Sequence, residues 1–174
     1  MIYQKCQPLI VDTGISTYEK NKRRNIERST ASHNTVMIGG KEQSEMWGGF
    51  RVGKRANIIS LEEKENFIRA VHDGYQTINC SHQRAFISTE KTFRIEDKIT
   101  GDKEGIAFLH FAPHIVFELK NNTIEGSDWR IEFSGFDEIT CSDYLFAEGF
   151  NQTKSAQKVS ITFYNNLITN LIFL

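Results

Sequence analysis

The sequence predicts an all-β fold, a sandwich of two antiparallel sheets with few or no helices. In several short stretches apolar residues alternate with polar ones, which is the pattern of strands with one buried face. The 13 phenylalanines and the many β-branched residues favour strands, and clusters of Gly, Asn and Asp separate the stretches. Short strands at regular spacing are typical of a sandwich. The 174 residues fit a single domain over residues 1–174, long enough to bury a sizeable core.

Four stretches in the second half of the chain show the clearest alternation. The apolar residues that share one parity are Phe93, Ile95 and Ile99, then Ile115, Phe117 and Leu119, then Trp129, Ile131 and Phe133, and last Val159, Ile161 and Phe163. Each set places its side chains on one face of a strand. The turn signals ITGDKEG, KNNTIEGSD and YNN lie between them. We therefore expect strands at residues 92–100, 114–120, 128–133 and 158–164.

The segment SLEEKENFIRAV, residues 60–71, fits two structures. Ser60 and Glu63 have the spacing of a capping box, which predicts the start of a helix. The same region also fits two strands, residues 56–62 and 66–75, joined by a charged turn at EKEN. We favour the hairpin because every neighbouring segment is β-like.

A polar and basic stretch from Thr13 to Ser32 predicts a long exposed loop. Its arginines Arg23, Arg24 and Arg28 are candidates for binding an anionic sugar chain, because a guanidinium pairs with carboxylates and sulfates through two hydrogen bonds. The alternative is a solvated loop without a ligand. Trp47 stands beside two glycines in EMWGGF, where it would either stack on a sugar ring or belong to the core.

The overall charge excludes some partners. A net charge of −1 gives no field that would favour nucleic acid or an anionic membrane, so neither is expected as a partner. No apolar run approaches the roughly 20 residues that a membrane span needs. The three cysteines are widely spaced and form no CxxC motif, so we expect free or buried thiols.

Two of the five histidines have suggestive surroundings. His33 precedes a short apolar strand, and His72 opens the sequence HDGY, which contains Asp73 and Tyr75. Two imidazoles and a carboxylate from neighbouring strands would suit zinc, with a fourth position left for water or substrate. The alternative is a pair of histidines that form hydrogen bonds at sheet edges.

These same segments resemble the heparinase II/III-like family. RSTASHNTV, residues 28–36, and HDGY are the specific pieces, and the resemblance runs from about Asp12 to the end of the chain. It implies a C-terminal β-sandwich of large antiparallel sheets, of the supersandwich type. Whole members of the family also carry an N-terminal α/α toroid, and the substrate cleft lies between the two. The resemblance therefore implies that the toroid is absent from this chain and is its partner in a full protein.

The resemblance implies β-elimination on a uronic-acid-containing polysaccharide. His33 and Tyr75 are then the catalytic candidates, while Arg23, Arg24, Arg28 and Trp47 would bind the acidic polysaccharide. His33, His72 and Glu45 would hold a zinc ion, with Asp73 as the second choice for the acidic ligand. We expect the chain alone to be inactive, because half of the cleft would be missing. The alternatives are a non-catalytic carbohydrate-binding or structural module linked to surface-polysaccharide metabolism, and a sandwich without activity of its own.

Overall fold

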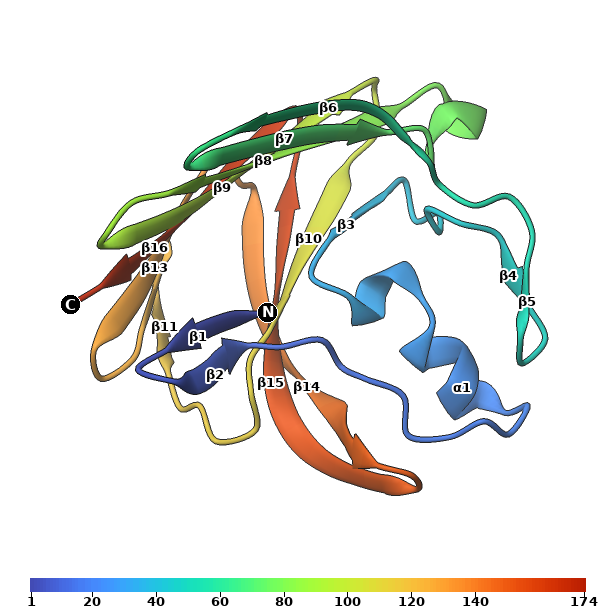
Figure 1. Ribbon diagram of the computed structural model, residues 1–174, viewed down its shortest axis with the longest axis horizontal. Helices are drawn as coiled ribbons and strands as arrows, with labels where there is room; N and C mark the ends of the chain where they lie inside the picture. Colours follow the sequence, from blue (N-terminus) through green and yellow to red (C-terminus); the bar gives the residue numbers. More distant parts are fainter.

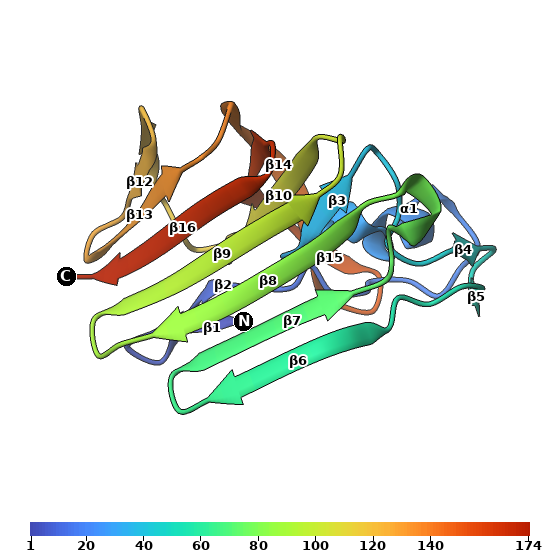
Figure 2. The ribbon, with the colours of Figure 1, turned by 90° about the horizontal axis from the view of Figure 1, so that it is seen from above.

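Two antiparallel sheets form the fold in the computed structural model, which describes residues 1–174 (Figure 1). In the larger sheet the strand order is β11-β12-β13-β16-β9-β8-β7-β6. These strands are β6 (Ile58–Lys64), β7 (Phe67–His72), β8 (Ser81–Ser88), β9 (Thr92–Thr100), β11 (Glu118–Lys120), β12 (Thr123–Glu125), β13 (Trp129–Ser134) and β16 (Asn166–Phe173). Figure 2 shows most of them side by side. The predicted all-β sandwich is confirmed.

The smaller sheet has four strands in the order β14-β15-β10-β3. They are β3 (Val36–Ile38), β10 (Gly105–His110), β14 (Glu138–Gly149) and β15 (Gln152–Phe163). Two further hairpins complete the strands, namely β1 (Ile2–Gln4) with β2 (Gln7–Ile10) and β4 (Met46–Trp47) with β5 (Arg51–Val52). The helical segments are α1 (Lys22–Glu27) and the 3-10 turns η1 (Thr30–Ser32) and η2 (Gln76–Ile78). No helix is long enough to cross a membrane.

The core lies between the two sheets. Its buried side chains come from alternate positions of both, including Val36, Val159, Ile161 and Phe163 of the smaller sheet and Ile99, Ile131, Phe133, Leu167 and Leu171 of the larger one. Alternation therefore predicted β9 and β13 to within one residue, whereas β15 begins at Gln152, six residues before the expected start. The strand expected at 114–120 is shorter, since only Glu118–Lys120 pairs as β11. Ile115 and Phe117 precede that strand and still pack against the core.

The hairpin interpretation of residues 56–75 is also confirmed. Strands β6 and β7 pair antiparallel, with Leu61 opposite Ala70, and the chain turns at Glu65 and Asn66. Seven residues of β6 form the last strand of the larger sheet. The helix suggested by Ser60 and Glu63 does not form, because the segment gains ladder hydrogen bonds to β7 instead.

The prediction that Thr13–Ser32 is an exposed loop is wrong. Asn21 caps α1, because its side-chain oxygen accepts a hydrogen bond from the backbone N–H of Arg24 at 2.9 Å. Seven residues of the stretch are buried, namely Thr13, Ser16, Thr17, Arg24, Glu27, Thr30 and Ser32. Internal hydrogen bonds engage Thr13, Ser16 and Thr30, so a polar composition did not mean a solvated segment.

Residues 18–29 and 41–56, which we call the basic lobe, lie on one side of the sandwich with α1, β4 and β5 (right in Figure 1). The lobe holds nine lysine and arginine residues against four glutamates, a net charge of +5. The rest of the chain holds 12 lysine and arginine residues against 18 acidic residues, a net charge of −6. The overall −1 therefore conceals a strong separation of charge, which is a physical basis for attracting an anionic ligand to one side of the molecule.

Candidate functional site

His33 stands at an exposed junction and is paired with a carboxylate. It follows η1 in extended conformation, just before β3, and Asp12 follows β2. His33 Nδ1 and Asp12 Oδ2 are 2.6 Å apart, with the two side chains 40% and 48% exposed. A carboxylate accepts only, so Nδ1 carries the hydrogen and Nε2 is left to meet a ligand. The hydrogen bond to Asp12 raises the pKa of His33, and the same bond lowers the pKa of Asp12.

Asn34 fixes the backbone beside His33. Its Oδ1 accepts hydrogen bonds from the backbone N–H of His110 at 2.8 Å and from the His110 ring Nδ1 at 3.2 Å. Its Nδ2 donates to the Val11 carbonyl at 2.8 Å. Burial lowers the pKa of His110 to about 4, so this ring is neutral near pH 7. One side chain thus ties β10 and the end of β2 to the segment that carries His33.

A hollow of about 380 Å³ opens next to this junction. It is lined by Thr13, Arg23, Ile26, Glu27, Ser32, His110, Asp143, Tyr144, Leu145 and Lys158. Thr13 and Ser32 are the chain neighbours of Asp12 and His33, and the Thr13 hydroxyl donates to the Ser32 carbonyl at 3.0 Å. Burial lowers the pKa of Lys158 in the same wall. The hollow therefore presents titratable groups of both signs beside the exposed pair.

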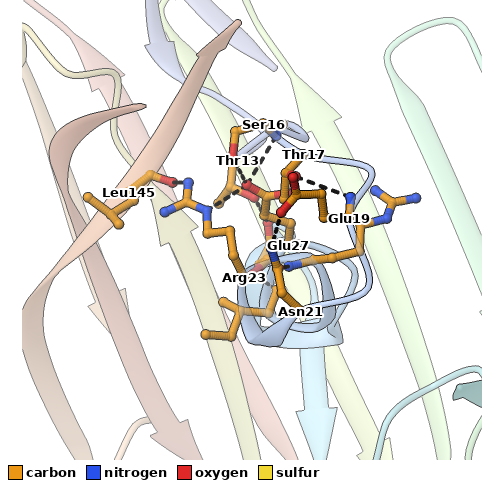
Figure 3. A network of polar contacts seen from close by, with 12 residues as sticks. Thr13, Ser16, Thr17, Glu19, Asn21, Arg23, Glu27 and Leu145 are labelled. Atoms are coloured by element: carbon orange, nitrogen blue, oxygen red, sulfur yellow. Dashed lines mark hydrogen bonds and ion pairs between the residues drawn. The ribbon is translucent and has the colours of Figure 1, made fainter. Parts of the chain in front are cut away.

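A buried carboxylate organises one wall of the hollow (Figure 3). Glu27 is 3% exposed, and its Oε1 accepts hydrogen bonds from the backbone N–H of Ser16 at 3.0 Å, the Ser16 hydroxyl, and Arg23 Nε at 2.6 Å. Arg23 also donates to the Leu145 carbonyl at 3.2 Å. Burial pushes the pKa of Glu27 upwards, but the bonds from Ser16 and Arg23 outweigh it, and the pKa is lowered. Glu27 thus stays charged and joins α1 to the preceding loop.

A second chain of polar groups lies between the sheets. His82 Nε2 donates to Asp97 Oδ1 at 2.7 Å, and both side chains are 2% exposed. Arg84 donates to both oxygens of Asp97, at 2.7 and 3.0 Å, and to the Asn34 carbonyl at 2.5 Å. The Arg84–Asp97 pair on β8 and β9 therefore reaches across to the His33 segment and supports it.

His72 belongs to this buried chain. Its Nδ1 accepts a hydrogen bond from the backbone N–H of Gly74 at 3.2 Å, so its hydrogen must be on Nε2. That Nε2 lies 3.1 Å from His82 Nδ1 and donates to it. Both nitrogens of His72 are thus engaged, and neither offers a lone pair to an ion.

The zinc set expected from the sequence does not fit the side chains present. His72 is occupied by His82 and Gly74, whereas His33 is paired with Asp12. Glu45 is exposed beside the β4–β5 hairpin, and Asp73 accepts a hydrogen bond from the Asn57 backbone N–H at 2.7 Å. No group of three or more His, Cys, Asp and Glu side chains in the structure is arranged to hold a metal ion. We therefore assign no step to a metal.

Tyr75, the second catalytic candidate, does not reach the surface of this domain. Its side chain is fully buried in the core, and its hydroxyl donates to the Val36 carbonyl at 2.6 Å. Burial strongly raises the pKa of Tyr75, so the phenol stays protonated. The HDGY turn places this ring inward because η2 begins at the next residue and turns the chain back towards β8.

The three candidate arginines differ in their surroundings. Arg23 is bound to Glu27 and borders the hollow. Arg24 is 6% exposed, and its Nε donates to the Gly49 carbonyl at 3.1 Å, so the structure does not present this candidate sugar-binding residue at the surface. Arg28 is held by the carbonyls of Gly48 and Arg51 at 2.9 and 3.1 Å on the exposed side of the lobe. Trp47 is 50% exposed and borders the lobe's hollows, as a sugar-stacking residue requires.

Known proteins resemble this chain in family pattern and in fold. The family described as heparinase II/III-like, C-terminal, matches residues 1–169. Among solved structures, a heparinase III (BT4657 gene product) superposes with a TM-score of 0.72 at 16% identity, over 95% of this chain and 28% of that one. Heparan sulfate lyase HepC from Pedobacter heparinus gives a TM-score of 0.70 at 15% identity, over 97% of this chain and 29% of that one.

The chain thus spans less than a third of the length of these solved structures. No matching relative is found among curated protein sequences. At 14–17% identity the solved structures establish the fold. The match of the family over almost every residue establishes descent, and the protein belongs to the heparinase II/III-like family, in the part of it that forms the C-terminal domain.

Proposed function

We propose that this chain is the C-terminal domain of a polysaccharide lyase that cleaves a uronic-acid-containing polysaccharide by β-elimination, with His33 as its proton-transfer residue. The observation that carries this proposal is the exposed Asp12–His33 pair. Asp12 contacts Nδ1 of His33, so Nε2 is free to meet a ligand. Family membership supports the reaction class, and the basic lobe supports an acidic substrate.

In β-elimination a base takes the C5 proton, which the neighbouring carboxylate makes acidic. The C5–H electrons form the C4–C5 double bond while the C4–O4 bond breaks, and O4 leaves with a proton. Neutral His33 would receive the C5 proton on Nε2, and Asp12 would stabilise the imidazolium that forms. A base whose pKa is raised from 6.5 is matched to work near neutral pH.

The chain alone should not turn over substrate. The match to a solved heparinase III covers only 28% of that chain, so most of such a protein lies outside this domain. Charge stabilisation of the developing enolate, which is the demanding part of the reaction, needs donors close to the substrate carboxylate. We propose that a further domain, the α/α toroid implied by the family resemblance, supplies these donors and the acid.

The test measures the ultraviolet absorbance of unsaturated products on heparan sulfate, hyaluronan and alginate. The chain alone should give none, and a protein that carries this domain behind a helical domain should give product. His33→Ala in that protein should abolish product formation, whereas His114→Ala, at an exposed histidine that does not line the hollow, should not. Equal activity in His33→Ala and the parent would contradict the assignment.

A non-catalytic carbohydrate-binding module is the second candidate. The observation that favours it is the basic lobe, whose charge could hold an acidic polysaccharide without any reaction. This candidate predicts binding of acidic oligosaccharides with no product from either the chain or the longer protein. The product assay therefore separates the two functions.

A further inference from the structure

Three aromatic rings from separate segments meet on the basic lobe and the adjoining hairpin tip. Tyr18 precedes α1, Phe50 lies in the turn between β4 and β5, and Phe150 lies at the tip of β14–β15. The Tyr18 ring is nearly parallel to both others, at 8° with centroids 6.5 Å apart for Phe50, and at 20° with 6.4 Å for Phe150. Each ring is more than half exposed, at 58%, 59% and 64%. We call these three residues the aromatic row.

A buried cation lies against the row. The Arg24 guanidinium carbon is 5.3 Å from the centroid of Tyr18 and 5.6 Å from that of Phe50. Arg24 is almost completely buried, so the exposed rings cover it, and it has no carboxylate partner. Its Nη1 has no hydrogen-bond partner at all. A positive charge on one side of the rings disfavours a second cation on the open side, so the row suits a neutral or anionic ligand.

Trp47 extends this surface with two hollows. One, of about 210 Å³, is lined by Lys20, Trp47, Gly48, Gly49, Phe50 and Arg51. The other, of about 280 Å³, is lined by Asn25, Arg28, Ser29, Glu42, Met46, Trp47 and Gly48. Trp47 borders both, and Phe50 joins the first hollow to the aromatic row. The hollows and the row are therefore one continuous surface of aromatic faces and cations.

The cations of this surface are free to bind an anion. Lys20, Arg28 and Arg51 lie within 4.0 Å of no carboxylate, whereas Arg69, Arg94 and Arg130 on the larger sheet are all in ion pairs. Two backbone carbonyls fix the Arg28 guanidinium in place. A cation held in position loses less freedom on binding, so it contributes more to affinity than a mobile one.

We propose that the aromatic row, Trp47 and the three cations Lys20, Arg28 and Arg51 form a binding site for an acidic polysaccharide chain, separate from the His33 junction. Pyranose rings would stack on the aromatic faces, and carboxylates or sulfates would pair with the cations. The acidic class of ligand rests on the proposed function. The site itself rests on the rings and charges, and it would hold the chain while a neighbouring unit is presented to His33.

The test is the affinity of the chain for a size-defined heparan sulfate oligosaccharide, with hyaluronan and alginate oligosaccharides of equal length alongside. The double variant Tyr18→Ala/Phe150→Ala should bind about tenfold more weakly, as expected for the loss of two ring contacts. Tyr164→Ala, an aromatic residue of similar exposure between β15 and β16, should bind as the parent does. Thermal unfolding of each variant checks that the fold is intact.

The cations of the proposed site are tested by a second variant with its own control. Lys20→Ala/Arg51→Ala should weaken binding and flatten its dependence on salt, because fewer counterions exchange on binding. Lys91→Ala/Lys98→Ala removes two exposed cations without ion pairs, one in the β8–β9 turn and one on β9, and should change neither the affinity nor its salt dependence. Equal affinity of the parent and both lobe variants would overturn the site while leaving the proposed reaction intact.

Two further outcomes would also count against the proposal. If the parent chain binds no acidic oligosaccharide, both this site and the substrate class of the proposed function are wrong. If the aromatic variant changes the sedimentation of the chain and not its sugar affinity, the row is a contact between copies of the protein.

Discussion

Two carboxylate–histidine pairs of almost equal length occupy opposite surroundings in this domain. The Asp12–His33 pair is 2.6 Å long and 40–48% exposed, while the Asp97–His82 pair is 2.7 Å long and 2% exposed. In the exposed pair one histidine nitrogen is left for a ligand. In the buried pair every nitrogen is used, because His72 occupies the second nitrogen of His82. The same chemical contact therefore leaves one histidine nitrogen unpaired at the surface in one place and joins the strands of the sandwich in the other.

The largest effect should follow from breaking the buried pair. Asp97→Ala leaves His82 and Arg84 buried without their acceptor, and we expect it to lower the free energy of unfolding by about 3–5 kcal/mol. Denaturant unfolding measures this. Glu96→Ala is the matched control, because Glu96 pairs with Arg94 on the exposed side of the same strand and should cost less than about 1 kcal/mol. Similar losses in both variants would remove the distinction between the two pairs.

The buried Asp97 and the exposed His33 should respond to pH in opposite directions. The pKa of Asp97 is lowered from 3.8 to about 2; burial works against this, but the charge of Arg84 and the bond from His82 outweigh it. The unfolded chain then binds the proton more readily, so about 2 kcal/mol of stability is lost as pH falls from about 4 to about 2. His72 and His110, whose pKa values burial lowers from 6.5 to about 4, add a loss between those pH values.

His33 contributes with the opposite sign. Its pKa is raised, so its stabilisation is present below pH 6.5 and is lost as pH rises through the folded value. Because both partners are widely exposed, this contribution should be small. Unfolding measured from pH 8 to pH 2 tests the contributions of His33 and of the buried groups. A free energy of unfolding that stays constant between pH 6.5 and pH 4 would contradict the contribution of His72 and His110.

Tyr75→Phe should have an intermediate effect. It removes the hydroxyl that donates to the Val36 carbonyl and leaves that oxygen with one partner fewer, at a cost of about 1–2 kcal/mol. Tyr164→Phe, on an exposed ring, should cost nothing measurable. Loss of turnover in Tyr75→Phe with unchanged stability would show that this tyrosine reaches the substrate after all.

The smallest effect on stability should come from the exposed pair. Asp12→Asn should change the free energy of unfolding by less than about 1 kcal/mol. It should nevertheless return the pKa of His33 towards 6.5, because the carboxylate that stabilises the imidazolium is gone. Histidine ring signals followed by NMR through a pH series measure this, and an unchanged His33 titration would refute the role of Asp12.

Sequence patterns predicted the strands well because alternation is a local property. The fold class followed from it, and the β6–β7 hairpin followed from the β-like neighbours, whereas RSTASHNTV stood out only through its resemblance to a known family. The sequence did not reveal Asp12 as the partner of His33, because this contact spans 21 positions and depends on how β2 meets η1. Asp97 left a signal that alternation could have found, since it takes the buried parity between Ile95 and Ile99. A charged residue at a core position indicates a buried partner.

The buried polar residues of Thr13–Ser32 show that composition alone does not predict burial. Composition marked the stretch as solvated, yet Glu27 is enclosed by Ser16 and Arg23, and Arg24 lies under Tyr18 and Phe50. Such contacts join residues whose positions only the three-dimensional fold determines. The separation of charge was visible in the sequence once the segments were counted separately, but the row of aromatic rings was not, because Phe150 is far along the chain.

The most direct test of the central claim is the titration of His33 with and without an acidic oligosaccharide bound. If His33 is the ligand-facing member of the two pairs, an anionic sugar near Nε2 should raise the pKa of His33 further. The signals of His82 should stay unchanged, since that ring is enclosed by His72 and Asp97. A saturating oligosaccharide that leaves the His33 titration untouched would contradict the account.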